Sequence, residues 1–161
     1  MEQLDNLAIL GQVDVFRGLP KDALDGLAKL AQPRSFEEGA MLMRQGDVSE
    51  SMYVIIQGKV QVERTDPLLR GPLVLAELGP GEIVGELAVL DGEPRSATVT
   101  SMEPTQTLEL TAPALAITVL QHPEVSRALL MVLSQRLRTT DQLAVKLLRK
   151  QLHLEWKPIQ T

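Results

Sequence analysis

Between Arg34 and Thr111 the sequence consists of short runs of alternating apolar and polar residues, separated by Gly, Pro and Asp. Alternation with a period of two places successive side chains on opposite faces of a strand, and closely spaced turn residues end each strand. Many short strands in one stretch are typical of a β-sandwich or a β-barrel. The pattern therefore predicts a mainly β fold for this part of the chain.

The strand candidates within this region are well separated. Residues 53–56 and 60–62 flank the compact turn pair Gln57-Gly58, which predicts a β-hairpin over residues 51–64. Further strands are expected at residues 41–43, 73–78, 96–101 and 105–110. Two dipeptides that end in proline, Asp66-Pro67 and Gly71-Pro72, lie at the two ends of an expected exposed loop.

Helical patterns flank the β region on both sides, at residues 4–10, 20–31, 113–121 and from 123 to about 154. In the second of these, Pro20 sits where a first-turn proline is tolerated, and Pro33 ends the helix. Its apolar face comprises Leu24, Leu27, Ala28 and Ala31.

The last helix carries a seam of apolar or small residues at spacings of three and four. The seam residues are Leu130, Leu133, Leu137, Thr140, Ala144, Leu147 and Leu154, and Gln151 completes the spacings of three and four. At 1.5 Å per residue the helix is about 45 Å long, more than a small barrel can cover. A parallel homodimer along this helix is therefore predicted, with Thr140 as the polar position of the seam. The alternative is a helix that packs on its own barrel.

Residues 81–100, GEIVGELAVLDGEPRSATVT, predict a strand, a short helix and a second strand around an anion site. Gly85 allows a tight turn and a close approach of the backbone to a ligand. Residues 86–90 have the composition of a helix of one to two turns, whose first amides have no internal partners and can bind phosphate. Arg95 follows a turn and a proline, where a guanidinium can hold phosphate through two hydrogen bonds.

The joint spacing of G-E-L-A and P-R-S-A-T, with five residues between them, resembles the phosphate-binding cassette of the cyclic-nucleotide-binding domains. These domains occur in bacterial catabolite activator proteins, protein kinase A regulatory subunits and nucleotide-gated channels. The resemblance covers about residues 13–145. It implies a single domain over residues 1–161: an eight-stranded jelly-roll β-barrel over about residues 33–111, N-terminal helices, a short cassette helix, and C-terminal helices over about residues 113–154.

The resemblance also implies the roles of the cassette residues. Arg95 would pair with the nucleotide phosphate, and the Ser96 hydroxyl with the amides of Ser96 and Ala97 would complete the cradle. A carboxylate is an odd neighbour for a phosphate, but in the family the residue that matches Glu86 binds the ribose 2′-hydroxyl. The backbone groups expected to approach the ribose and phosphate belong to Gly85 and Leu87.

The base contacts rest on an alignment at Arg136-Leu137. Thr140 then matches the residue that contacts the adenine amino group in catabolite activators, and Asp141 falls where their dimer partner supplies a second polar contact. Asp141 differs from the hydroxyl usual there, which leaves the contact across the dimer open. The Ser directly after the cassette Arg, Ser96 in this chain, resembles the residue at that position in bacterial cAMP receptors. We therefore expect cAMP as the ligand, with cGMP as the alternative. Trp156 is either a lid over the base or a side chain packed on a nearby apolar surface.

This chain lacks the residues that several other classes of protein require. The chain has no Cys, which excludes disulfides and thiolate metal sites and fits a reducing compartment. Its two histidines, His122 and His153, lie in predicted helices, so neither a cupin-type metal site nor a Ser-His-Asp set can be assembled. No enzyme activity, metal or cofactor is therefore expected. Neither a signal peptide nor an 18-residue apolar stretch is visible, which predicts a cytoplasmic protein without a membrane span.

Charge and length bear on the partners. The net charge is −5, although the chain from Arg136 onward holds six basic and two acidic side chains, so the body is strongly acidic. An acidic body argues against broad nucleic-acid binding. Only LEWKPIQT follows the long helix, too little for a helix-turn-helix, so no DNA binding is expected of this chain. The prediction is a stand-alone cAMP sensor with an unknown downstream protein partner; a fragment of a longer transcription regulator or channel is the alternative. The presence of Glu86 and Arg95 argues against a domain that has lost nucleotide binding.

Overall fold

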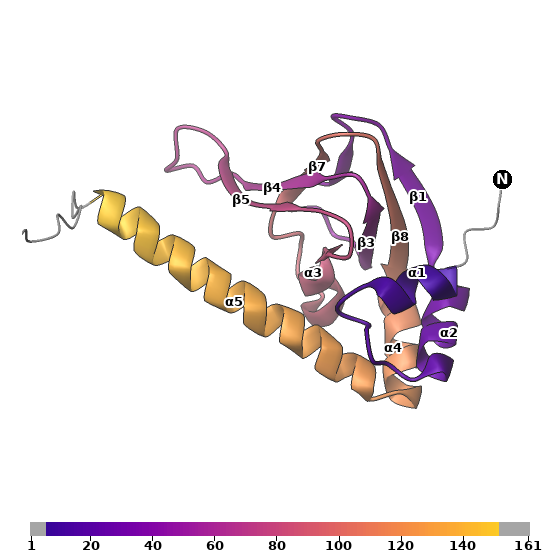
Figure 1. Ribbon diagram of the computed structural model, residues 1–161. Coiled ribbons are helices and arrows are strands. Elements are labelled where there is room, and N and C mark those ends of the chain that lie inside the picture. Colours follow the sequence, from indigo (N-terminus) through magenta and orange to yellow (C-terminus); the bar gives the residue numbers. More distant parts are fainter. Residues whose placement is uncertain (1–5, 152–161) are drawn as a thin grey trace, which may run out of the picture.

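The computed structural model describes residues 6–151 (Figure 1). Two short helices, α1 (Asn6–Gln12) and α2 (Lys21–Leu30), precede the strands. The described strands are β1 (Gln32–Phe36), β2 (Met41–Met43), β3 (Ser51–Gln57), β4 (Val60–Arg64), β5 (Leu73–Leu78), β6 (Ile83–Val84), β7 (Thr98–Ser101) and β8 (Thr105–Thr111). Helix α3 (Glu86–Asp91) lies between β6 and β7, and α4 (Ala112–Gln121) and α5 (Glu124–Gln151) follow β8.

The strands of residues 6–151 form two four-stranded antiparallel sheets, in the orders β1-β8-β3-β6 and β2-β7-β4-β5. This alternation of the chain between two sheets is a jelly roll, as the resemblance implied. The strands expected at residues 41–43 and 73–78 are confirmed at both ends. The expected helix at residues 20–31 is α2, with Pro20 just before its first residue at the N-cap and not inside the first turn.

The hairpin predicted over residues 51–64 is wrong. β3 pairs with β8 and β6, whereas β4 pairs with β7 and β5 in the other sheet. Gly58, at φ 90°, carries the chain across; a β-carbon there would lie 2.5 Å from Thr105 Oγ1 and 2.7 Å from the Pro104 carbonyl oxygen. The Met102 amide donates to the Lys59 carbonyl at 2.8 Å, which ties the crossing to the β7–β8 turn. Two β runs around a short turn look the same in sequence whether they pair or separate into facing sheets.

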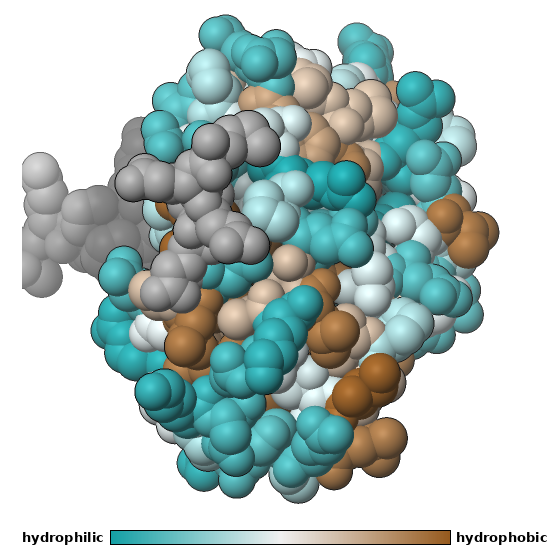
Figure 2. All heavy atoms as spheres, turned by 90° about the vertical axis from the view of Figure 1, so that its right-hand side faces the viewer, coloured by the Kyte–Doolittle hydropathy of each residue, from teal (hydrophilic) through white to brown (hydrophobic). Residues whose placement is uncertain are grey.

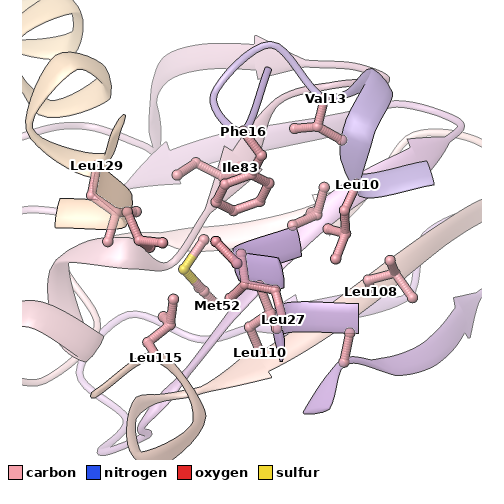
Figure 3. Close-up of a cluster of buried hydrophobic side chains, with 14 residues drawn as sticks. Leu10, Val13, Phe16, Leu27, Met52, Ile83, Leu108, Leu110, Leu115 and Leu129 are labelled. Carbon is pink, nitrogen blue, oxygen red and sulfur yellow. The ribbon is translucent and has the colours of Figure 1, made fainter. Parts of the chain in front are cut away.

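Strand β3 is buried on both faces and so contributes to two apolar clusters. Met52 and Val54 point into a cluster with the helices, while Tyr53 and Ile55 point into the space between the sheets. Figure 3 shows the first cluster, where side chains from α1, α2, α4 and α5 meet those of β3, β6 and β8. A strand buried on both faces reads as a continuous apolar run, which explains the sequence MYVII. β3 therefore packs against the helices on one face and against the second sheet on the other.

The N-terminal helices cover one end of the molecule. Figure 2 shows this face covered mainly by hydrophilic side chains, with hydrophobic ones scattered among them. Leu10, Phe16 and Leu27 are fully buried beneath that surface. The apolar residues of α1 and α2 thus serve the core of the same chain.

Helix α5 is 28 residues long, about 42 Å at 1.5 Å per residue, and it extends past the sheets in Figure 1. Its first turns are anchored in the core by Val125 and Leu129. Further along, Leu130 and Leu137 are each 64% exposed, so the seam is uncovered in a single chain. The predicted homodimer stays a prediction; Leu154, Trp156 and His153 lie outside the described residues. None of the described helices combines the length and apolarity that a membrane span requires.

Candidate functional site

The segment 81–100 folds as a short strand, a short helix and a second strand, the order expected from its sequence. β6 ends at Val84, and the next residue, Gly85, takes a left-handed conformation at φ 87° and caps the start of α3. A β-carbon at this position would lie 2.6 Å from Arg95 Nη1 and 2.9 Å from Met43 Cε. Gly85 is therefore required twice, once for its backbone angle and once for the space that the guanidinium occupies.

Arg95 is the buried cation of this segment, with 4% of its surface exposed. Its Nη1 donates to the Gly85 carbonyl at 2.9 Å, and its Nη2 donates to the hydroxyls of Ser49 at 2.8 Å and Ser51 at 3.3 Å. The backbone is held as well, since the Arg95 amide donates to the Asp47 carbonyl at 2.8 Å. Both ends of the residue are fixed before any ligand arrives.

All these side-chain partners of Arg95 are uncharged. Among the ion pairs of residues 6–151 none involves Arg95, and its Nε has no hydrogen-bond partner there. Burial lowers the pKa of Arg95, against smaller opposing contributions from Tyr53 and from the carboxylates of Glu109, Glu86 and Asp47. Because a guanidinium stays protonated in proteins, the site holds a buried positive charge that an anion would stabilise.

Glu86, the first residue of α3, is the buried carboxylate of the same site, at 1% exposure. Its Oε1 accepts a hydrogen bond from Arg136 Nη1 of α5 at 2.6 Å, and Arg136 Nη2 donates to the Ile83 carbonyl. Its Oε2 is buried and has no partner among the described residues. Arg136 thus neutralises Glu86 and links the cassette to the long helix.

Glu86, Arg95 and Arg136 line one small pocket between the cassette and the second sheet. The cavity measures about 50 Å³, enough for a few waters. The predicted residues Gly85, Glu86, Leu87, Arg95, Ser96 and Ala97 all line it. Leu87 and Ser96 are exposed at its rim, whereas Ala97 is buried. The structure thus brings six of the eight predicted site residues together.

Thr140 and Asp141 lie elsewhere, exposed on α5 and outside the residues that line this pocket. Thr140 follows Arg136 by four residues, so both lie on the same side of the helix. In this single chain the two residues form no part of the cassette pocket.

Three residues of the site were missed by sequence reasoning. Arg136 had served only to anchor an alignment, although its spacing of four from Thr140 was a usable signal. Ser49 and Ser51 carry no local signal, since they contact Arg95 across 46 and 44 residues of sequence. Within residues 6–151 no cluster of His, Cys, Asp or Glu could hold a metal ion.

Comparison with known proteins identifies the family of this chain. Residues 33–122, more than half of the chain, match the family model of the cyclic nucleotide-binding domain. This chain belongs to that family. It is 34% identical over 133 residues to a CRP-like cAMP-activated global transcriptional regulator of Mycobacterium tuberculosis, covering 83% of this chain and 59% of the regulator. It is 38% identical over 103 residues to a cAMP-dependent protein kinase regulatory subunit of Dictyostelium discoideum, covering 63% of this chain and 32% of the subunit.

Solved structures of family members have the same fold. The catabolite activator protein of Thermus thermophilus superimposes with a TM-score of 0.74 at 34% identity, over 83% of this chain and 62% of that one. The regulatory domain of Toxoplasma gondii protein kinase A, crystallised with cAMP, gives a TM-score of 0.64 at 29% identity, over 71% of this chain and 43% of that one. The chain thus spans less than two thirds of each of these proteins.

Proposed function

We propose that this chain is a cAMP-binding regulatory module, without enzyme activity of its own, and that its pocket at Gly85, Glu86 and Arg95 holds the nucleotide. The observation that carries the proposal is that two residues lining one pocket each hold a buried atom without a partner, the donor Arg95 Nε and the acceptor Glu86 Oε2. A buried polar atom without a partner costs about 1–3 kcal/mol. A cyclic nucleotide offers a phosphate oxygen to the donor and a ribose 2′-hydroxyl to the acceptor.

The charge of the pocket supports an anionic ligand. Its charged lining side chains are Glu86, Arg95 and Arg136, with a net charge of +1. A cyclic phosphate diester has a single negative charge, so its binding would leave the buried site neutral. The Ser96 hydroxyl and the amides of Ser96 and Ala97 would hold the remaining phosphate oxygens.

The adenine contacts are part of the proposal. Thr140 would receive the base as it extends from the cavity along α5, and Asp141 would supply a contact from a second copy of the chain. The exposed seam at Leu130 and Leu137 supports such a homodimer, because a large apolar surface on a long helix is stabilised by a partner. The names of the relatives, which include a cAMP-activated regulator, favour cAMP over cGMP.

The output would be a conformational change read by a partner protein, in a cytoplasmic setting. Glu86 is the link, because its carboxylate contacts the pocket on one side and Arg136 of α5 on the other. A ligand that changes the position of Glu86 changes the stability of this contact with α5. Different affinities for two arrangements of cassette and helix would then shift the equilibrium between them.

Isothermal titration of the protein with cAMP and cGMP tests the proposal. Arg95→Ala should abolish tight binding, because it removes a charge-assisted contact worth about 2–5 kcal/mol at a desolvated site. Arg70→Ala, in the exposed β4–β5 loop, is the matched control and should bind like the parent. Equal cAMP affinity in the Arg95 variant and the parent would refute the site assignment. Tighter binding of cGMP than of cAMP would identify cGMP as the ligand.

Titration with 2′-deoxy-cAMP tests the role of Glu86. Glu86→Gln should weaken binding of cAMP by more than it weakens binding of the deoxynucleotide, because only cAMP has a 2′-hydroxyl that would donate a hydrogen bond to Oε2. Equal losses for both nucleotides would show that Glu86 is not the ribose contact.

A further inference from the structure

The two serines that contact Arg95 lie outside residues 81–100, the segment whose sequence predicts this site. Ser49 Oγ lies 2.8 Å from Arg95 Nη2, the shorter of the two serine contacts, and 3.4 Å from Ser51 Oγ. Ser51 is buried at the start of β3, whereas Ser49 is half-buried in the loop between β2 and β3. Ser49 can therefore be changed with less disturbance of the core than Ser51.

The backbone on either side of Ser49 is anchored. The Asp47 carbonyl accepts from the Arg95 amide at 2.8 Å, and the Glu50 carbonyl accepts from the Ala112 amide at 2.6 Å. Only Val48 lies between Asp47 and Ser49, and it is 81% exposed. The Ser49 hydroxyl is thus presented to Arg95 from a short segment with a fixed point at each end, which makes it a prepositioned acceptor.

The chemistry of this acceptor decides what Arg95 can do. A carboxylate at the same place would also accept from Nη2, but it would form a buried ion pair and cancel the positive charge. A hydroxyl directs the guanidinium and leaves its charge uncompensated. With Nη1 held by the Gly85 carbonyl and Nη2 by Ser49, the atom left without a partner is Nε.

We propose that Ser49 is a positioning residue that orients Arg95 for an anionic ligand and, because it is neutral, preserves the net positive charge that attracts that ligand. The inference rests on the proposed function, since the ligand that reports on it is cAMP. It makes two separable claims, one about orientation and one about charge, and three substitutions at the same position test them.

Titration with cAMP separates the two claims. Ser49→Ala removes the nearer of the two serine acceptors of Nη2 and should weaken binding about tenfold, the lower end of the range for residues that support metal ligands. Ser49→Thr keeps the hydroxyl and should bind within about threefold of the parent. Ser49→Asp keeps an acceptor but adds a negative charge, and should bind more weakly than Ser49→Ala. Ser35→Ala, on the exposed face of β1, is the matched control and should bind like the parent.

Several results would overturn the inference. Unchanged affinity in Ser49→Ala, or failure of Ser49→Thr to restore it, would refute the orientation claim. Affinity in Ser49→Asp equal to or better than in Ser49→Ala would refute the charge claim. Thermal unfolding of each variant identifies any affinity loss that comes from general destabilisation, which would also count against the proposal.

An NMR measurement on the protein without nucleotide distinguishes a failure of this inference from a failure of the proposed function. The Nε–H resonance of Arg95 should shift or broaden in Ser49→Ala, return toward the parent position in Ser49→Thr, and stay unchanged in Ser35→Ala. If the parent failed to bind cAMP while these shifts appeared, the proposed function would fall and the positioning role would stand. If the parent bound cAMP and the Arg95 resonance were unchanged in Ser49→Ala, the positioning role would fall alone.

Discussion

Replacing Arg136 by Gln tests whether the long helix holds the carboxylate of the cassette. The change removes the positive partner of Glu86, whose side chain is 1% exposed, while the Arg136 side chain itself is 34% exposed. Removing one partner of a fully buried ion pair costs about 3–5 kcal/mol, whereas exposed pairs contribute about 0–1 kcal/mol. Because only one of the two groups is fully buried, we expect Arg136→Gln to lower the free energy of unfolding by about 1–2 kcal/mol.

Urea denaturation of the parent and variants measures this loss. Arg138→Gln, two residues further along α5 and exposed, is the matched control and should unfold like the parent. Adding Glu86→Gln to Arg136→Gln should recover stability, because it removes the buried charge that the first change left unpaired. The double variant should therefore be more stable than Arg136→Gln alone.

The same variant should bind cAMP more weakly, because the net charge of the pocket falls from +1 to zero while the carboxylate loses its fixed position. An Arg136→Gln protein with the unfolding midpoint and the cAMP affinity of the parent would refute the reasoning. In that case the contact between α5 and Glu86 would contribute nothing to either the fold or the site.

Two further predictions concern the backbone of the cassette and the outer part of α5. Gly85→Ala should destabilise the protein more than Gly81→Ala in urea denaturation. Of the two variants, only Gly85→Ala should weaken cAMP binding. Both positions have φ near 88°, but only at Gly85 does the new methyl group meet Arg95. Equal effects of the two changes would show that space at Gly85 is unimportant. Thr140→Ala should cost about 1 kcal/mol of cAMP affinity, and Thr140→Leu should tighten the dimer in analytical ultracentrifugation while weakening binding. A monomer at tens of micromolar, with cAMP affinity indifferent to both substitutions, would remove both proposed roles of this helix.

The cassette was readable in the sequence because its geometry is local. Gly85 and Arg95 lie ten residues apart, and the requirements that connect them, a left-handed backbone angle, a short helix and a turn, act over a few residues each. Likewise, the alternation of apolar residues predicted the strands, and the seam predicted a helix too long for its own domain. Spacing and periodicity express such constraints directly, so the strand-helix-strand order of the cassette could be predicted without tertiary information.

Only the tertiary structure decided how these elements are partnered. β3 and β4 separate into facing sheets because the chain crosses between the sheets at Gly58. β3 then pairs with β8 and β4 pairs with β7, two strands that come much later in the sequence. The partners of the site residues are also distant in sequence: Ser49 and Arg95 lie 46 positions apart, and Glu86 and Arg136 lie 50 positions apart. Contacts of this kind form when the two sheets close over a shared core and α5 packs beside it, and no local pattern in the sequence records which residues then meet.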